Sequence, residues 1–525
     1  MLNPLPLGRS TFAPLRERHE IYVDKTDLIL SLAQNDAKIF LARPRRFGKT
    51  LLVSTFESLF RDGLKHFRGL AIEGLWKDKT YPVIRLDFSG LTYFESRAQF
   101  EAALQSLLQS CFLPLGFGYR PELSSVCFMD QLKMWLARQP GSSLVLLIDA
   151  YDTPLTSQLD DRAAFETIRG CLAEFFAALK QYEGCFRFFF MTGIIKFTST
   201  SIFSEFNNFQ DISLDPLYGT LLGYTAEEIE DFFGDYLDRA ALVMKLDRKE
   251  VLERLREYYD GFTFDEEAGS RVFCPWSVLN FLNRPKRGFL NYWYSSGGQP
   301  TVLMKYLANH ALSQPISYGQ RFEVRLSQVG AARQFDDAGL EALLTQAGYY
   351  TIREITADHH AVLEYPNREV AESMAQLYAD QLLQGRRVRS STPIGQALDE
   401  GDVEAVVDYF NAAVSAIDYL RYPITDEASC RTYVQVLLIG AAMAPRVEVH
   451  SALGRSDMEV EAGDLHWVFE FKFARESSQA QRLLLEAVAQ MRSRRYGSPS
   501  HASKRIGVAL VFDKEQRRFV LYKCL

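Results

Sequence analysis

The segment FLARPRRFGKT, residues 40–50, carries residue types that bind nucleotide phosphates. An apolar strand leads into it, and Gly48, Lys49 and Thr50 end it as a phosphate-binding loop ends. In such a loop, backbone N–H groups and the N-terminus of the next helix converge on the phosphates. The predicted chemistry is ATP binding, in which Lys49 neutralises the outer phosphate oxygens and the Thr50 hydroxyl binds Mg²⁺.

One position departs from the common loop pattern. Arg43 stands where the first glycine is usual, so the chain must turn differently there. Such a turn leaves Arg45 and Arg46 close to the phosphates. The alternative is a basic loop followed by an ordinary helix. The predicted nucleotide-binding residues of this loop are Arg45, Arg46, Phe47, Gly48, Lys49 and Thr50.

Two later strands end in polar residues. The apolar strand LVLLID ends at Asp149, and an acidic residue at this position of a P-loop fold holds Mg²⁺ through water. The next residue is commonly a glutamate that orients the attacking water, but here it is Ala150. Thr192 ends the strand FRFFFMTG, where it would either sense the γ-phosphate or only cap the strand.

A second constellation lies near the C-terminus, in SDMEVEAGDLHWVFEFKFA. Metal-dependent phosphodiester hydrolysis needs two carboxylates on one divalent cation and a cation beside the attacking water. Asp457 ends one expected strand, and Glu470 and Lys472 lie two residues apart in the next. The period of two puts Glu470 and Lys472 on one face and the neighbouring phenylalanines on the other. A Mg²⁺ or Mn²⁺ nuclease site is predicted, although exposed edge strands also carry such pairs.

Several segments, in order along nearly the whole chain, resemble the AAA-ATPase-like family of bacterial and archaeal proteins with a C-terminal nuclease-like domain. They are YVDKTDLI, RPRRFGKTLL, LIDAYDTPL, MTGIIKFTSTSIFSEFNNFQDISLDP, YYDGFTF, CPWSVLNFL, YWYSSGG and YPNREV. In that family R-P-R-R-F-G-K-[ST] is the usual loop, so the resemblance implies a working nucleotide site with Arg43 in place. It also implies that residues 22–26, YVDKT, pack near the nucleotide base.

The chain departs from this family at one chemically important residue. The family motif D-E-Y-D is Asp149, Ala150, Tyr151 and Asp152 in this sequence. Either the chain has lost hydrolysis, or an original glutamate was changed deliberately to trap bound ATP. ATP binding without efficient turnover is expected, unless Asp152 substitutes for the missing carboxylate.

The spacing D-(x)12-E-x-K, followed by a helix, resembles the PD-(D/E)XK nuclease superfamily. The resemblance implies that Asp457 and Glu470 bind the metal and that Lys472 activates water or stabilises charge. In many such folds an upstream helix adds a glutamate, but none is found in CRTYVQVLLIGAAM, residues 430–443. The alternative is a degenerate nuclease fold that binds nucleic acid without cutting it.

The helix after this motif is expected to meet the substrate. The resemblance places Gln490, as a catalytic residue, and Tyr496 near the substrate phosphate. Arg492, Arg494 and Arg495 lie on the same segment and are expected to contact backbone phosphates.

The elements that must position these residues follow an α/β pattern. Apolar strands alternate with amphipathic helices over the first ~200 residues, as in a parallel sheet. We predict a P-loop domain over residues 1–215, a helical, winged-helix-like region over 216–310, a mixed linking region over 311–394 and an α/β PD-(D/E)XK domain over 395–525. The segment TAEEIEDFFGDYL opens on a Thr-x-x-Glu capping box.

Composition limits the class of protein. The chain has no apolar run of ~18 residues and no secretory signal, so no membrane partner and a cytoplasmic location are expected. Its seven scattered cysteines contain no C-x-x-C pair and predict neither a zinc site nor disulfides. From Lys472 onward, Lys and Arg exceed Asp and Glu by eight although the whole chain is at −7, which is compatible with a polyanionic partner or a solvated basic helix.

These observations predict an ATP-binding protein whose nucleotide state controls a metal-dependent nuclease, with a defence role against phage or mobile DNA by analogy. DNA is favoured over RNA as the nucleic-acid partner, and a homo-oligomer is plausible. Two alternatives stay open: a nucleotide-dependent switch or scaffold that grips nucleic acid, and an ATP-driven DNA-processing motor. Ala150 argues against the motor, because a motor must hydrolyse ATP.

Overall fold

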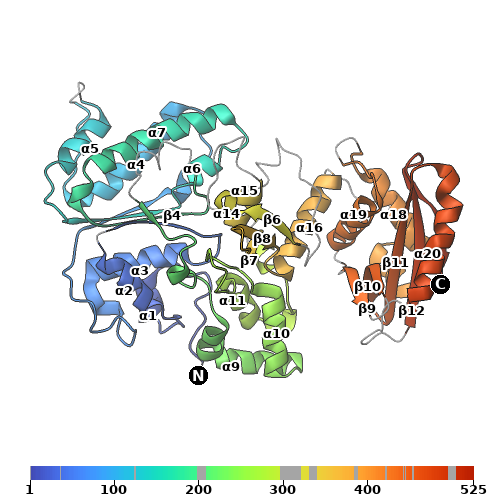
Figure 1. Cartoon of the computed structure of the whole chain (residues 1–525). Coiled ribbons are helices and arrows are strands. Elements are labelled where there is room, and N and C mark those ends of the chain that lie inside the picture. Colours follow the sequence, from blue (N-terminus) through green and yellow to red (C-terminus); the bar gives the residue numbers. More distant parts are fainter. Residues whose placement is uncertain are drawn as a thin grey trace. The chain divides into compact units, whose positions relative to one another are not determined.

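The computed structural model describes residues 2–35, 37–122, 126–197, 209–295, 321–329, 340–383, 388, 390–419, 422–441, 443, 445–451, 454–494 and 504–525. They form two compact units. The first comprises the described residues up to Ser295 together with Arg321–Val370, and the second runs from Ala371 to Leu525. Each unit has its own sheet and core (Figure 1). The predicted P-loop and helical regions thus share one compact unit.

The main sheet of the first unit is parallel and has the order β2-β3-β4-β1-β5. Its strands are β1 (Lys38–Ala42), β2 (Val83–Asp87), β3 (Leu144–Asp149), β4 (Phe186–Gly193) and β5 (Phe209–Asp211). All residues of β3 are buried, as expected for an apolar strand covered on both faces. Because the strands are parallel, the loop after β1 and the ends of β3 and β4 meet at one edge.

Helices cover both faces of this sheet, as Figure 1 shows. One face carries α1 (Phe12–Glu17), α2 (Thr26–Gln34) and α3 (Lys49–Asp62). The other carries α4 (Arg97–Phe112), α5 (Phe128–Leu136), α6 (Thr153–Thr156) and α7 (Arg162–Gln181). The aromatic run of β4 serves both faces: Phe188 and Phe190 stack near Phe56 of α3, whereas Phe189 joins the cluster around α7.

A helical group follows the sheet in the same unit. It contains α9 (Ala226–Met244), α10 (Arg248–Tyr259), α11 (Pro275–Asn283) and α12 (Tyr292–Ser295). The predicted capping box is confirmed, because the Thr225 hydroxyl accepts the Glu228 N–H at 3.2 Å and the Glu228 carboxylate accepts the Thr225 N–H at 2.8 Å. The apolar faces of these helices share a core with Val23 of the N-terminal segment.

A small antiparallel sheet completes the first unit. Its order is β6-β8-β7, with β6 (Phe322–Arg325), β7 (Thr351–Ile355) and β8 (His360–Glu364). The short helices α14 (Leu326–Val329) and α15 (Leu340–Gln346) accompany it. The chain then enters α16 (Arg368–Leu383), whose first residues belong to the first unit and whose remainder belongs to the second.

The second unit contains a mixed sheet of order β13-β12-β11-β10-β9. Its strands are β9 (Arg446–Ser451), β10 (Gly454–Ala462), β11 (Leu465–Ala474), β12 (Lys504–Asp513) and β13 (Arg518–Cys524). Its helices are α17 (Ile394–Glu400), α18 (Val403–Ala416), α19 (Glu427–Gly440) and α20 (Ala480–Arg494). Strands β11 and β12 are parallel, and the other pairings are antiparallel.

The two faces of β11 carry different residues, as the period of two predicts. Phe469 lies beside Phe410 of α18, whereas Val468 packs against Ala487 and Met491 of α20. Glu470 and Lys472 alternate with the aromatic residues, so they lie on the Val468 face. Burial of both faces sets the register of β11 and therefore the placement of its charged pair.

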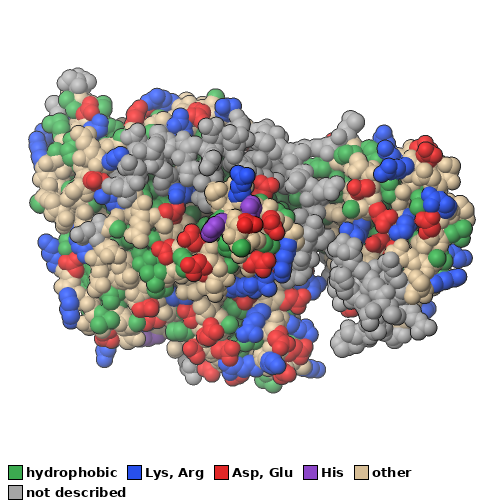
Figure 2. Space-filling view, in the orientation of Figure 1, with side chains coloured by type: hydrophobic (Ala, Val, Ile, Leu, Met, Phe, Trp, Pro, Cys, Tyr) green, Lys and Arg blue, Asp and Glu red, His purple; other side chains and the backbone are tan. Residues whose placement is uncertain are grey.

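The outer surface carries mixed charge. On the face shown in Figure 2, acidic and basic side chains are interspersed over both units. Among the described helices, none has the length and apolar content needed to cross a lipid bilayer.

Candidate functional site

The phosphate-binding loop turns out of β1 with left-handed backbone at two residues. Arg46 has φ 70° and Gly48, which precedes α3, has φ 94°. Glycine adopts this conformation without strain, which explains Gly48. The Lys49 ammonium donates to the carbonyl oxygens of Arg43 and Pro44, each at 2.8 Å. A phosphate must therefore draw Lys49 away from the carbonyls of its own loop.

The Arg43 side chain is hydrogen-bonded to the protein backbone. It is buried, and its guanidinium donates to the carbonyls of Ala42 at 2.9 Å, Ser213 at 2.5 Å and Tyr218 at 3.0 Å. The guanidinium also lies 4.4 Å from the ring centre of Phe264. Arg43 thus fastens the start of the loop to the segment after β5, which accounts for the unusual turn without a first glycine.

Thr50 and Asp149 meet where a P-loop protein binds Mg²⁺. The Thr50 hydroxyl lies near the buried Asp149 carboxylate and acts on its pKa. Burial raises the pKa of Asp149, while the Thr50 hydroxyl and the charge of Lys49 oppose that rise. Hydroxyl and carboxylate oxygens are suitable ligands, directly or through water, for the Mg²⁺ of a bound nucleotide.

Asp152 and Thr192 are engaged with the backbone. One carboxylate oxygen of Asp152 accepts the N–H groups of Ile194 at 3.0 Å and Ile195 at 2.9 Å, beyond the end of β4. The Thr192 hydroxyl donates to the Leu41 carbonyl of β1 at 2.8 Å and is fully buried. This geometry matches the strand-capping alternative for Thr192. It also makes Asp152 a poor replacement for a glutamate at Ala150.

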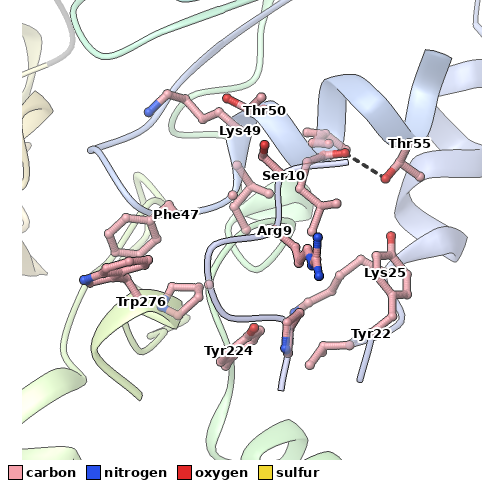
Figure 3. Close-up of a pocket in the computed structure, with 18 of the residues that line it drawn as sticks. Arg9, Ser10, Tyr22, Lys25, Phe47, Lys49, Thr50, Thr55, Tyr224 and Trp276 are labelled. Carbon is pink, nitrogen blue, oxygen red and sulfur yellow. Dashed lines mark hydrogen bonds between the residues drawn. The ribbon is translucent and has the colours of Figure 1, made fainter. Parts of the chain in front are cut away.

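A pocket of about 350 Å³ opens beside the loop and the start of α3 (Figure 3). Lys49 and Thr50 lie at one side of it, and Phe47 and Trp276 form a second wall. The N-terminal segment supplies further residues, including Tyr22 and Lys25. Apolar walls beside a phosphate-binding loop suit the base and ribose of a nucleotide.

Charged groups define the edges of this pocket. Lys25 forms an ion pair with Glu228 of α9 at 2.5 Å, which joins the N-terminal segment to the helical group. The exposed Arg46 places its guanidinium 4.3 Å from the ring centre of Trp276. Of the predicted loop residues, Phe47 is buried against Phe262 and Phe264 and so supports the loop.

The second unit brings together the three residues of the predicted nuclease motif. The Asp457 carboxylate accepts the backbone N–H of Phe471 at 2.8 Å, next to Glu470. The Lys472 ammonium lies 3.2 Å from a carboxylate oxygen of Glu470. Burial, and after it the charge of Asp457, raises the pKa of Glu470 to about 7. Arg431 of α19 flanks Asp457 at 3.7 Å.

Glu427 is a functional candidate that the sequence analysis missed. It is the first residue of α19, and its carboxylate lies 3.2 Å from the Lys472 ammonium. Burial, and then the charge of Asp457, raises the pKa of Glu427. This corrects the expectation that the upstream helix supplies no glutamate, because α19 begins at Glu427, three residues before Cys430. The available signal was the helix start, where Asp426 and Ser429 form a capping box.

The carboxylates suit a hard divalent cation. Glu470 is fully buried, and its second carboxylate oxygen has no hydrogen-bond partner among the described residues. Such an oxygen is costly to bury unless a cation or donor satisfies it. Lys472 holds the other oxygen, and within the described ranges no three acidic, His or Cys groups already stand at metal-binding distance. Oxygen donors of this kind fit Mg²⁺ or Mn²⁺, which would share the carboxylates with Lys472.

The predicted nucleic-acid contacts lie at the end of α20. Gln490 is half-buried and directly precedes Met491, which packs on Val468 at the far end of β11 from Lys472. Arg492 is exposed, and Arg494 ends the helix, although its side chain is not described. Arg495 and Tyr496 lie outside the described residues.

Two family models match regions of the chain that contain the two candidate sites. Residues 6–203 match a family described as "Predicted AAA-ATPase", and residues 426–521 match the "PD-(D/E)XK nuclease superfamily". The second match begins at the capping residue before Glu427. An Azotobacter chroococcum mcd 1 protein described as "Uncharacterized protein in vnfD 5'region" is 31% identical over 532 residues, covering 98% of each chain. No solved structure matches significantly.

The two matched regions contain, respectively, the Lys49–Thr50–Asp149 geometry and the Asp457–Glu470–Lys472 geometry. The chain is therefore a nucleotide-binding, nuclease-like protein that belongs to the AAA-ATPase-like family with a C-terminal PD-(D/E)XK nuclease domain.

Proposed function

We propose that this protein is a metal-dependent nuclease, acting on DNA in preference to RNA, whose cutting is controlled by ATP bound at the P-loop. One observation carries the proposal: a half-buried lysine, Lys472, lies between the carboxylates of Glu470 and Glu427 and beside Asp457. Glu470 is fully buried among these charges, and such a buried charge is expensive for a purely structural sheet. A defence role in the cytoplasm is compatible with such an activity and rests on analogy.

Asp457, Glu470 and Glu427 would hold Mg²⁺ or Mn²⁺ in this proposal. The bound ion would supply Lewis-acid activation of water and of the phosphodiester. Lys472 keeps its proton, because the neighbouring Glu470 and Glu427 raise its pKa despite burial, which lowers it. Its ammonium therefore provides a permanent donor that orients water and stabilises phosphate charge. Arg431 and the arginines of α20 would hold the nucleic-acid backbone.

ATP is proposed as the control ligand, with its base in the pocket of Figure 3 and its phosphates on the loop. Lys49 would leave the Arg43 and Pro44 carbonyls for the outer phosphates, and Thr50 with Asp149 would hold Mg²⁺. The methyl side chain of Ala150 cannot orient water, and a carboxylate oxygen of Asp152 accepts backbone N–H groups. Slow turnover suits a control ligand better than a fuel.

The test is cleavage of plasmid and linear DNA by the full-length protein in Mg²⁺ or Mn²⁺, with and without ATP. Lys472→Ala is the matched inactive variant. Lys472 lies on β11 opposite its aromatic face, so truncating the side chain leaves that face intact. Cleavage that disappears in this variant and responds to ATP supports the proposal. If the wild type binds ATP but cuts neither DNA nor RNA, the protein is instead a nucleotide-dependent switch or scaffold.

A further inference from the structure

The first turn of α16 contains a buried acidic residue. Glu369 is completely buried, and its two carboxylate oxygens accept the Ser277 hydroxyl and the backbone N–H of Trp293, both at 2.7 Å. Both of these donors are neutral. Burying a carboxylate is costly unless hydrogen bonds satisfy its oxygens. The bonds that satisfy Glu369 also fix the relative positions of the groups that donate them. Glu369 joins three segments that are distant in sequence: α11, α12 and α16.

Trp293 extends this arrangement to the phosphate-binding loop. Its indole N–H donates to the Arg45 carbonyl at 3.2 Å, and its ring packs beside Tyr349. Successive carbonyls of the loop therefore have different partners: Lys49 holds those of Arg43 and Pro44, and Trp293 holds that of Arg45.

A bound nucleotide must disturb this set of bonds. When Lys49 turns to the phosphates, the Arg43 and Pro44 carbonyls lose their donor, and the loop's N–H groups must face the ligand. The peptide of Arg45 lies between those carbonyls and Gly48. Reorientation there changes the bond to Trp293, whose own backbone N–H is held by Glu369. The change thus reaches α16 through two hydrogen bonds.

The residues at the start of α16 also contact the segment that follows α10. The Asn367 side chain donates to the Asp260 carbonyl at 2.7 Å and accepts the Val370 N–H at 3.0 Å. A Cβ on Gly261 would lie 2.1 Å from the Pro366 carbonyl oxygen, so the backbones meet closely there. The helix then continues into the unit that holds Lys472.

We propose that Trp293 and Glu369 are positioning residues that transmit the nucleotide state of the loop to α16, and along that helix to the nuclease unit. The last step rests on the proposed function, whereas the link from the loop to α16 does not. Neither residue touches the phosphates. Their role is to let the first turn of α16 respond to the ligand.

The test measures amide hydrogen exchange in α16 of the full-length protein, with and without ATP and Mg²⁺. In the wild type, ATP is expected to change exchange in the first turns of α16. Trp293→Phe keeps a ring but loses the indole donor, so that change should vanish. ATP affinity should change by no more than about tenfold, because one neutral hydrogen bond is lost. Glu369→Gln, which keeps the side-chain shape, should likewise weaken the response.

Trp135→Phe is the control, since Trp135 of α5 packs among Phe112 and Phe117 and contacts neither the loop nor α16 in the described contacts. It should retain the full response. The proposal is overturned if ATP leaves α16 unchanged in the wild type, or if Trp293→Phe and Glu369→Gln bind ATP and respond like the wild type. A normal α16 response without cleavage of any nucleic acid would leave this link standing and remove the proposed nuclease.

Discussion

The two sites each centre on a partly buried lysine, and the direct hydrogen-bond partners of the two lysines differ. Lys49 is held by neutral carbonyls of its own loop, and burial lowers its pKa to about 8. Lys472 lies between two carboxylates from different elements, and their charges raise its pKa. Lys49 can exchange its neutral carbonyl partners for a phosphate, whereas Lys472 stays charged beside its carboxylates. This difference separates a site that binds and releases a control ligand from a site built for chemistry.

Removing the Lys472 ammonium should have the largest effect. Lys472→Ala is expected to lower the cleavage rate by about 10²–10³-fold, since removing one positioned donor that stabilises transition-state charge costs about that much. ATP binding should be unchanged, because Lys49 lies in the other unit. Nuclease rates and ATP titrations measure both. Equal loss of the two activities would mean that the variant is misfolded.

Placing a carboxylate at residue 150 probes the nucleotide site. Ala150→Glu is expected to raise ATP turnover by about 10²-fold, because a positioned base activates water. The φ of 55° at Ala150 already carries the strain of a Cβ, so the exchange adds little backbone strain. Phosphate release measures the rate. No gain would show that the absence of a carboxylate at residue 150 is not what limits hydrolysis.

Glu427 sharpens the chemistry of the nuclease site. Glu427→Gln is expected to reduce metal affinity or cleavage by about 10–100-fold, as removal of a supporting metal-site carboxylate does. Glu476→Gln, an exposed residue after β11, is the matched control and should behave as the wild type. The comparison uses cleavage against Mg²⁺ concentration. Identical curves for the two variants would exclude Glu427 from the site.

Glu470 should trade stability for activity. Its folded pKa, about 7, exceeds the ordinary value of 4.5, so the unfolded chain ionises first and stability falls as pH rises from 4.5 to 7. Glu470→Gln is therefore expected to gain roughly 1–3 kcal/mol above pH 7 and to lose cleavage. Below pH 4.5 the two proteins should be equally stable. Denaturant unfolding of both proteins at several pH values measures this difference in stability. A stability gain of Glu470→Gln that did not change with pH would contradict the prediction.

The pH dependence of ATP binding should be the smallest effect. In the protein without nucleotide, Lys49 loses its proton as pH rises through about 8, and phosphate binding needs the ammonium. ATP affinity is expected to fall above pH 8 by at most about tenfold per pH unit. Isothermal titration from pH 7 to 9.5 measures this. A flat profile would indicate that the loop amides, and not Lys49, provide most of the phosphate binding.

The candidate nucleotide site was largely readable because its parts are local. Gly48, Lys49 and Thr50 are consecutive, and the backbone between β1 and α3 makes the site. Asp149 could be added from its position at the end of a buried strand. The roles of Asp152 and Thr192 could not be read in this way, because their partners, Ile194, Ile195 and Leu41, are set by strand neighbours.

The sequence by itself determined the elements and the faces they present. The period of two placed Glu470 and Lys472 together, and apolar strands implied a parallel sheet covered on both sides. Only the tertiary structure brought Glu427 to Lys472, 45 residues away, and linked Arg45 to Trp293, 248 residues away. Periodicity fixes which way a side chain points within its own element. Which distant group it meets depends on how separate elements bury their apolar faces together, and no local pattern records that.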